Sequence, residues 1–270
     1  MKRLFIFSLT ILATITSIHA QEKSVWNGKK CAVSLTYDDG LNVDLDNAIP
    51  VLDSMKFKGT FYVSGFSPGF KDRLTGWKKA SAKGHEISNH TIYHPCTGKI
   101  AGREWVNPDY DLSNYSVKKI CDEILMTNVL LRTLDGKTRR TFAYPCGDTK
   151  IGDSLYFDQV KPDFVAARGV TPVIEQIKTV DIYNIGSFMI NGQTGEDLIK
   201  LVKQAMKEKG LLVFLFHGVG GEHNLNVSLK AHSELLHFLK QNEKDIWIAP
   251  IADISERIRT HQNTSSTKQN

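Results

Sequence analysis

Residues 35–40 read Leu-Thr-Tyr-Asp-Asp-Gly, and an apolar run at residues 31–35 leads directly into them. The run predicts a short buried strand that Gly40 ends. Side chains alternate between the two faces of a strand, so Asp38 and Asp39 can reach one cavity only where the backbone turns at the strand's end. Barrels of alternating strands and helices place their chemistry at such ends. Three later segments of the same kind favour this interpretation over an ordinary solvated turn.

The first residues have the three parts of a secretory signal peptide. Lys2 and Arg3 form a charged region, residues 4–13 form an apolar region, and the small residue Ala20 stands at the cleavage position. A membrane anchor would need a longer apolar span than this one. We therefore predict a signal peptide at residues 1–20 and an exported mature protein, periplasmic or secreted, with no stable membrane span.

The rest of the chain is long enough for one large domain or two small ones. No Pro-, Gly- or Ser-rich linker divides it, so we predict a single domain at residues 21–259. Residues 260–270 contain no apolar residue and are predicted to form a disordered tail. Without Lys2 and Arg3 the formal net charge falls from +5 to +3, which is too small to argue for a nucleic-acid partner. We expect a monomer.

The mature chain contains four cysteines, none of them in a C-x-x-C pair: Cys31, Cys96, Cys121 and Cys146. In an oxidising compartment they permit up to two disulfides, in three connectivities. Four separate buried thiols are the alternative. Without paired spacing, a four-cysteine zinc site is not indicated.

Helix-like and strand-like segments alternate along the chain. Apolar residues recur at helical spacing in residues 45–55, 73–82, 113–134, 195–209, 231–239 and 253–259. Strands are predicted at residues 31–35, 60–63, 86–88, 140–144, 163–167, 184–190, 211–216 and 246–249. This alternation indicates a mainly parallel sheet, either open or closed. No Gly-rich phosphate loop marks an open dinucleotide-binding sheet, so we predict an α/β fold, a single-domain distorted (β/α) barrel with about seven strands.

Two histidines follow the third predicted strand. His90 and His94 are four residues apart, so in a helical turn their rings lie on one face, where both can bind one metal ion. Asp39 completes a set of two histidines and one carboxylate, which leaves positions open for water and substrate. The helical metalloprotease pattern is absent because Thr91, not Glu, follows His90.

A tight turn follows the strand predicted at residues 140–144. Pro145 and Gly147 mark this turn, and such turns expose backbone N–H groups that can stabilise a developing oxyanion. An ordinary β-turn is the alternative.

One further histidine stands at the end of a predicted strand. His217 follows the apolar strand at residues 211–216 and precedes several glycines, where it is placed for general acid chemistry. A hydrogen-bonded structural histidine fits the same pattern. We assign no role to His223, His232 or His237, which have the pattern of surface or helix residues.

Together these segments resemble the signature motifs of the polysaccharide deacetylase family, the NodB-homology carbohydrate esterases of family 4. The similarity extends over residues 30–254. The resemblance implies that Asp38 is the catalytic base and that Asp39, His90 and His94 are the metal ligands. These ligand types suit Zn²⁺ best, although Co²⁺, Ni²⁺ or Mn²⁺ would also fit.

The same resemblance implies roles for the other two segments. His217 matches the family's catalytic acid. The turn formed by Tyr144, Pro145, Cys146 and Gly147 matches the segment whose backbone helps to form the oxyanion hole, with Cys146 where an aromatic residue is usual.

One position departs from the family pattern. The family often has an arginine two residues before the turn's proline, where it orients the base, but this chain has Ala143 there. Arg168, after the next predicted strand, can supply the same charge from a neighbouring strand end. Asp181 is the nearest candidate for the family's partner aspartate. Both are candidate base-orienting residues.

The activity implied by the resemblance is the hydrolytic removal of acetyl groups from a carbohydrate polymer or oligomer. Water attacks the acetyl carbonyl with an aspartate base and a histidine acid. The bond is either an N-acetyl amide, as in chitin-like glycans or peptidoglycan, or an O-acetyl ester, as in xylan. Both reactions pass through the same tetrahedral intermediate, so the motifs do not choose between them.

Two other classes of function are compatible with parts of the sequence: a non-catalytic glycan-binding relative and a metal protein without hydrolytic activity. Asp38 and His217 argue against the first. Residues 96–114, with Trp105 and Tyr110, are long enough to shape a substrate groove, and their aromatic residues are equally compatible with a minor core.

Overall fold

A computed structural model describes residues 25–266 of the chain. The signal peptide predicted at residues 1–20 lies outside the described residues. Within residues 25–266, no helix is both long enough and apolar enough to cross a membrane.

The centre of the fold is β1 (Cys31–Asp39), whose residues are buried along the strand except at Asp39. It pairs in parallel with β2 (Thr60–Val63) on one side and β9 (Leu211–Phe216) on the other. Its first residues also pair with β12 (Ile246–Ile248). The sheet continues from β2 through β3 (Glu86–Asn89), β4 (Thr141–Ala143) and β7 (Ala166–Arg168), and from β9 to β8 (Phe188–Met189).

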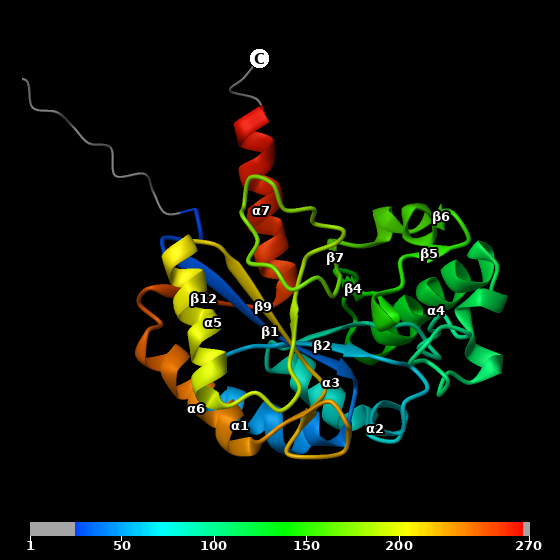
Figure 1. The fold of residues 1–270 in the computed structure, drawn as a ribbon, viewed down its shortest axis with the longest axis horizontal. Helices are drawn as coiled ribbons and strands as arrows, with labels where there is room; N and C mark the ends of the chain where they lie inside the picture. Colours follow the sequence, from blue (N-terminus) through cyan, green and yellow to red (C-terminus); the bar gives the residue numbers. More distant parts are fainter. Residues whose placement is uncertain (1–24, 267–270) are drawn as a thin grey trace, which may run out of the picture.

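Every pairing in this sheet is parallel, and seven strands succeed one another along its path. The sheet curls into a half-barrel, which confirms the predicted α/β fold with about seven strands (Figure 1). Because the strands run in the same direction, their carboxyl ends meet at one edge. Two short pairs lie outside this sheet: β5 (Lys150–Ile151) with β6 (Ser154–Leu155), and β10 (Gly218–Val219) with β11 (Asn226–Val227).

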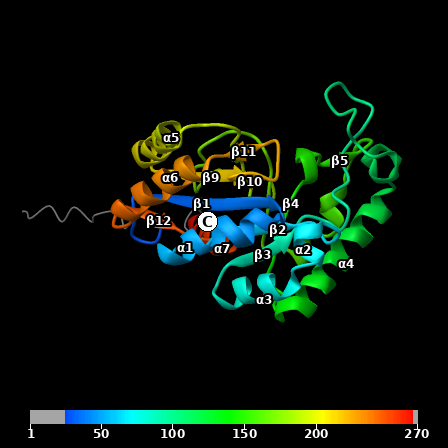
Figure 2. The same cartoon turned by 90° about the horizontal axis from the view of Figure 1, so that it is seen from below.

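Helices cover the outside of the curled sheet. They are α1 (Ile49–Ser54), α2 (Pro68–Lys71), α3 (Leu74–Ala82), α4 (Val117–Asp135), α5 (Gly195–Glu208) and α6 (Leu229–Gln241). The last helix, α7 (Ile251–Ser266), packs against the opposite face of the sheet. Helices α5 and α6 pack against each other toward one end of the sheet, and α3 and α4 do so toward the other (Figure 2). Local signals set their ends: α4 begins at the cap Ser116 and ends at Gly136, whose φ is 74°, and α5 begins with a capping box of Thr194 and Asp197.

The face of the sheet turned away from the main apolar core carries a buried carboxylate. Glu86 accepts hydrogen bonds from the hydroxyls of Thr60 and Thr141 at 2.9 and 2.6 Å. It also accepts the backbone N–H of Ala252 at 3.0 Å, in the first turn of α7. A carboxylate there satisfies one of the unpaired N–H groups of the helix N-terminus. Glu86 therefore fixes α7 against the sheet.

The last helix extends further than the sequence pattern indicated. We expected residues 260–270 to be disordered, and this is wrong for the part that α7 (Ile251–Ser266) covers. The side-chain amide of Gln262 donates to the backbone carbonyls of Ile177 and Val180, which anchors the helix end. The prediction of disorder rested on the absence of apolar residues, and composition gives no indication of polar anchors of this kind.

Helix α6 contains a buried histidine, His232. Its Nε2 shares a 2.8 Å hydrogen bond with the hydroxyl of Tyr37, a residue of β1. Burial lowers the pKa of His232 to about 4, so the ring is neutral at neutral pH. His232 therefore helps to attach α6 to the central strand.

Candidate metal centre and active site

The carboxyl ends of the strands surround a cavity of about 950 Å³. Asp38 and Asp39 end β1, His90 and His94 follow β3, and His217 follows β9. All five line this cavity, as their positions at strand ends predict.

Asp39, His90 and His94 form a group that fits a divalent metal ion. The Oδ1 atom of Asp39 lies 3.7 Å from His90 Nε2 and 3.5 Å from His94 Nε2. One ligand atom from each residue lies within 4.8 Å of the other two. Two ligands of a tetrahedral zinc ion stand about 3.4 Å apart, so these separations suit such an ion.

The protonation of this group also suits a metal. The Nδ1–H of His90 donates to the carbonyl of Ala143 at 2.8 Å, which leaves the lone pair on Nε2. Burial lowers the pKa of His90 to about 4. Burial alone would raise the pKa of Asp39, but the neighbouring imidazoles, led by His94, hold that pKa below its usual value. Neutral imidazoles and an ionised carboxylate are the forms that bind metal ions.

Asp38 is paired with a buried arginine. The Nη2 of Arg168 donates to Asp38 Oδ2 at 2.5 Å, and the exposed fractions of the two side chains are 0% and 5%. The guanidinium also lies over the ring of Tyr62, 5.1 Å from its centroid. The other carboxylate oxygen, Asp38 Oδ1, is buried and makes no hydrogen bond to the described residues. Arg168 thus fixes one oxygen and leaves the other able to accept a proton.

Arg168 stands beside the position where the motif's arginine is missing. The register of β4 and β7 pairs Ala143 with Arg168. The two residues are therefore neighbours on adjacent parallel strands, at the same distance from the cavity edge. The geometry fits the hypothesis that a neighbouring strand supplies the charge.

The turn after β4 holds a strained backbone. Gly147 donates its N–H to the carbonyl of Tyr144 at 3.0 Å, closing the turn that begins at Pro145. At Gly147 φ is 74°, and a Cβ there would lie 2.4 Å from a methyl group of Val170, so only glycine fits. Tyr144 and Cys146 line the cavity.

Several non-glycine residues around the cavity have a left-handed backbone. The angle φ is 75° at Asp39, 64° at Thr91, 53° at His94 and 55° at Cys146. Each such residue costs roughly 1–3 kcal/mol unless its surroundings hold it, and these residues concentrate at functional sites. One restraint is local: the hydroxyl of Thr91 accepts the N–H of His94 at 2.9 Å.

His223 also lines the cavity, although the sequence analysis assigned it no role. Its ring stacks on that of His217 with 4.7 Å between centroids, and its Nε2 lies 3.9 Å from Asp39 Oδ2. Its Nδ1 accepts the N–H of Leu225 at 3.0 Å, so the ring hydrogen is on Nε2. No motif spacing marks His223, because it follows β10 in a loop that only the fold brings to the site.

His217 itself is largely enclosed. Burial lowers its pKa, an effect that Asp38 and Asp39 oppose. Its Nδ1 is buried and has no hydrogen-bond partner among residues 25–266. At neutral pH the ring is therefore mainly neutral.

Asp181 does not take part in this arrangement. Its side chain is exposed and accepts the backbone N–H of Tyr183 at 2.8 Å, so it stabilises its own turn. The proposed base-orienting role of Asp181 is thus corrected. Of the two candidates, Arg168 is the one that contacts Asp38.

The cysteines form one disulfide, Cys96–Cys146, and leave Cys31 and Cys121 as buried thiols. The sequence left open either up to two disulfides or four separate thiols, and the structure has one disulfide and two thiols.

Residues 27–158 match a family model described as polysaccharide deacetylase. These residues belong to the polysaccharide deacetylase family. The family predicted from the motifs is thereby confirmed. The match includes both aspartates, His90 and His94, and ends before Arg168 and His217.

A curated relative, a chitooligosaccharide deacetylase of Sinorhizobium fredii, is 32% identical to this chain over 99 residues. These residues are 36% of this chain and 45% of the relative, so the chain spans less than half of that protein's length.

Solved structures share the fold at low identity. A candidate polysaccharide deacetylase from Mycobacterium smegmatis superposes with a TM-score of 0.63 and 14% identity, over 87% of this chain and 92% of that one. A family 4 acetyl xylan esterase from Clostridium thermocellum, in complex with a cobalt ion, superposes with a TM-score of 0.51 and 19% identity. That alignment covers 82% of this chain and 89% of the esterase.

We predict that His90→Ala weakens Zn²⁺ binding by more than about 100-fold. Mutating a residue that only hydrogen-bonds to a metal ligand already lowers metal affinity about 10- to 100-fold, and here a ligand itself is removed. Asp38→Asn should retain the metal because Asp38 is engaged by Arg168. Calorimetric titration with Zn²⁺ measures both, and His237→Ala, on the exposed face of α6, is the matched control. Thermal unfolding checks that each variant is folded. If His90→Ala still bound one ion tightly, His90 would be removed from the ligand set.

Proposed function

We propose that this protein is an exported, metal-dependent hydrolase that removes acetyl groups from a carbohydrate polymer or oligomer. The main observation in support is the pairing of two functions at adjacent positions of β1. Asp39 lies with His90 and His94 in a group suited to a divalent ion, while Asp38 has one carboxylate oxygen fixed and the other unpaired.

Asp39, His90 and His94 would hold the ion, with Zn²⁺ first by ligand type and Co²⁺, Ni²⁺ or Mn²⁺ as alternatives. When bound there, a divalent ion supplies a Lewis acid that polarises an acyl carbonyl and acidifies water. The family includes a structure solved with cobalt, which agrees with this assignment.

The surrounding residues would move the protons. Asp38 Oδ1 is the acceptor for the proton of the attacking water, with Arg168 holding the carboxylate in position. His217 is the donor to the leaving nitrogen or oxygen. Because burial lowers its pKa, His217 must take up a proton within the cavity before it can donate one. Backbone N–H groups of the turn at residues 144–147 would stabilise the oxyanion.

Aromatic side chains that line the cavity are evidence for a glycan substrate. The rings of Tyr93 and Tyr110 stack with centroids 4.8 Å apart and an angle of 9°. Phe66 lies 5.4 Å from Tyr93, and Trp105 is 64% exposed. All four line the cavity, so they act as a surface rather than as a minor core. Flat aromatic faces suit the C–H faces of sugar rings.

The bond cleaved is an N-acetyl amide or an O-acetyl ester. The curated relative is named for chitooligosaccharides, which carry the amide, and the structural neighbour for acetyl xylan, which carries the ester. The proposed arrangement stabilises the tetrahedral intermediate of either bond. The substrate panel below separates the two.

Export and domain organisation complete the proposal. Residues 1–20 would be removed as a signal peptide, and residues 21–259 would contain the catalytic domain, active as a monomer. A disulfide between Cys96 and Cys146 agrees with an oxidising compartment such as the periplasm or the exterior.

We predict that the purified protein releases acetate from an acetylated glycan and that prior treatment with a chelator abolishes the release. Adding Zn²⁺ or Co²⁺ back to the chelated protein should restore it, because the ligand group needs no other component. An acetate assay over acetylated chitooligosaccharides, peptidoglycan fragments and acetyl xylan measures the activity and identifies the bond. Release that chelation leaves unchanged would contradict a metal-dependent mechanism.

We predict that Arg168→Ala lowers kcat by about 100-fold or more at pH 7, the low end of the effect of a general base. Without Arg168 the Asp38 carboxylate loses the hydrogen bond that fixes its Oδ2, so Oδ1 is no longer held toward the attacking water. Guanidinium ion added to the variant should restore part of the rate. An unchanged rate would show that Arg168 does not orient the base.

A further inference from the structure

The Cys96–Cys146 disulfide joins two segments of the active site that lie far apart in sequence. Cys96 comes two residues after His94, and Cys146 is in the turn that follows β4. Their Cα atoms are 5.7 Å apart, and 50 positions separate them along the chain. One covalent link thus connects a candidate metal ligand's loop to the candidate oxyanion turn.

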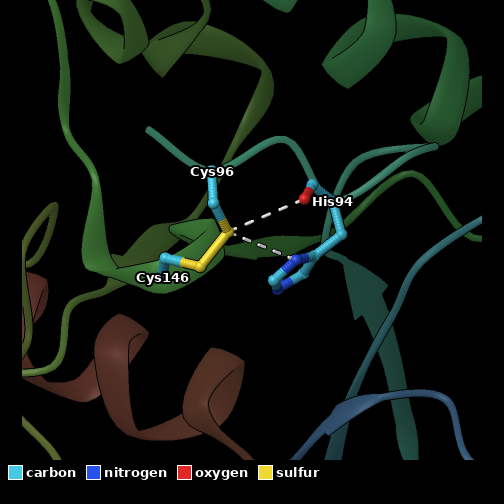
Figure 3. Close-up of side chains that lie close together, drawn as sticks. All are labelled: His94, Cys96 and Cys146. Atoms are coloured by element: carbon cyan, nitrogen blue, oxygen red, sulfur yellow. Dashed lines mark hydrogen bonds between the residues drawn. A yellow bond between two sulfur atoms is a disulfide. The ribbon is translucent and has the colours of Figure 1, made fainter. Parts of the chain in front are cut away.

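The disulfide sulfur of Cys96 lies against the ring of His94. It is 3.5 Å from Nδ1 of that ring and 3.7 Å from the carbonyl oxygen of His94 (Figure 3). The other ring nitrogen, Nε2, is directed to Asp39 at 3.5 Å. The sulfur therefore contacts the imidazole on the side opposite the proposed metal position.

This contact selects one tautomer of the imidazole. A disulfide sulfur carries no hydrogen, so in this pair Nδ1–H is the donor and the sulfur the acceptor. The hydrogen is then on Nδ1 and the lone pair on Nε2, which is the form that can bind a metal ion. His90 reaches the same form through the carbonyl of Ala143. The two histidines thus have different partners for the same purpose.

The backbone on both sides of the link is strained. His94 and Cys146 both have a left-handed conformation, with φ of 53° and 55°. Residues other than glycine keep this conformation only where surrounding structure holds them. The disulfide is the covalent restraint shared by these two segments.

We infer that Cys96 and Cys146 are positioning residues for His94: their disulfide fixes the tautomer and direction of its imidazole, so that metal affinity depends on the oxidised state of the pair. This inference rests on the proposed function, because it assigns His94 to the metal. Nothing in it requires contact between either cysteine and the substrate.

A set of polar contacts, here called the polar clamp, joins the same loop and turn independently of the disulfide. Arg103 pairs with Asp148 at 2.5 Å and donates to the carbonyl of Cys146 at 3.0 Å. The carboxylate of Asp148 also accepts the N–H of Thr97 at 2.7 Å. These bonds hold the loop and the turn together when the disulfide is open, but none of them involves the His94 ring. Reduction is therefore expected to release His94 without unfolding the protein.

Reduction of the Cys96–Cys146 disulfide by dithiothreitol is expected to change the tautomer of His94. The S–S bond breaks, each sulfur gains one electron and one proton, and dithiothreitol gives up two of each as it closes to its cyclic disulfide. The new Cys96 thiol can donate its hydrogen to His94 Nδ1, which favours the tautomer with hydrogen on Nε2. That tautomer cannot bind a metal ion through Nε2.

The test compares Co²⁺ binding by the oxidised protein, by protein reduced anaerobically and freed of dithiothreitol, and by the same protein after reoxidation. Competition with a chelator gives the affinity, and alkylation with peptide mass analysis confirms which cysteines are open. We expect reduction to weaken Co²⁺ binding by about 10- to 100-fold and reoxidation to restore it, with little change in melting temperature. Turnover should fall mainly in kcat at limiting Co²⁺, with KM for the glycan unchanged.

Two variants control the result. Cys96→Ala/Cys146→Ala should bind Co²⁺ as weakly as the reduced protein and should not respond to dithiothreitol. Arg103→Met removes the arginine bonds of the polar clamp but leaves the sulfur against His94, so it should keep both the affinity of the oxidised protein and its response to reduction. Equal affinities in the two redox states would overturn the inference. So would tighter binding on reduction accompanied by a thiolate-to-cobalt absorption band.

The binding measurement uses no substrate, so it separates the two hypotheses. Failure to release acetate from any glycan would contradict the proposed function and leave the redox dependence of Co²⁺ affinity standing. Redox-independent affinity in a protein that does release acetate would contradict only the inference.

Discussion

The buried ion pair between Arg168 and Asp38 is the constraint on which the active-site arrangement depends. Taking both charges out of water costs several kcal/mol per ion, and only good geometry with further contacts offsets that cost. The structure supplies the contacts: a 2.5 Å hydrogen bond and the ring of Tyr62 beneath the guanidinium. The hydroxyls of Tyr62 and Thr141 are hydrogen-bonded at 3.0 Å, and the Thr141 hydroxyl is also hydrogen-bonded to the Glu86 carboxylate at 2.6 Å. A connected polar network thus runs from the strand ends to the first turn of α7.

This constraint separates two adjacent carboxylates that would otherwise be equivalent. Asp38 turns toward β7 and is fixed by an arginine, whereas Asp39, with its left-handed backbone, turns toward the histidines that follow β3. One strand end would therefore present the proposed proton acceptor and the proposed metal ligand side by side. The same principle governs the two histidines, each of which presents Nε2 because a neighbour occupies its Nδ1: the carbonyl of Ala143 for His90 and the sulfur of Cys96 for His94.

Much of this could be predicted from the sequence, because the strand ends carry local signals. Apolar runs ended by glycine or proline located Asp38, Asp39, His90, His94 and the turn at residues 145–147, and parallel strands necessarily bring their carboxyl ends together. Arg168 was accessible as a hypothesis because it directly follows the strand predicted at residues 163–167. His223 was not, since its loop has no periodicity and reaches the cavity only by folding.

Asp181 was misassigned because nearness in sequence said nothing of the turn that holds it exposed. The disulfide could not be chosen either, because cysteine spacing does not determine which two cysteines the fold brings together, here with their Cα atoms 5.7 Å apart.

The most direct test of the central claim is a crystal structure of the Zn²⁺-loaded protein with anomalous diffraction recorded at the zinc edge. The arrangement described here predicts one ion bound by a carboxylate oxygen of Asp39 and by Nε2 of His90 and of His94. Asp38 should lie outside the ligand shell and still be paired with Arg168. An ion held by Asp38, or an Arg168 detached from that carboxylate, would contradict the division of roles between the two aspartates.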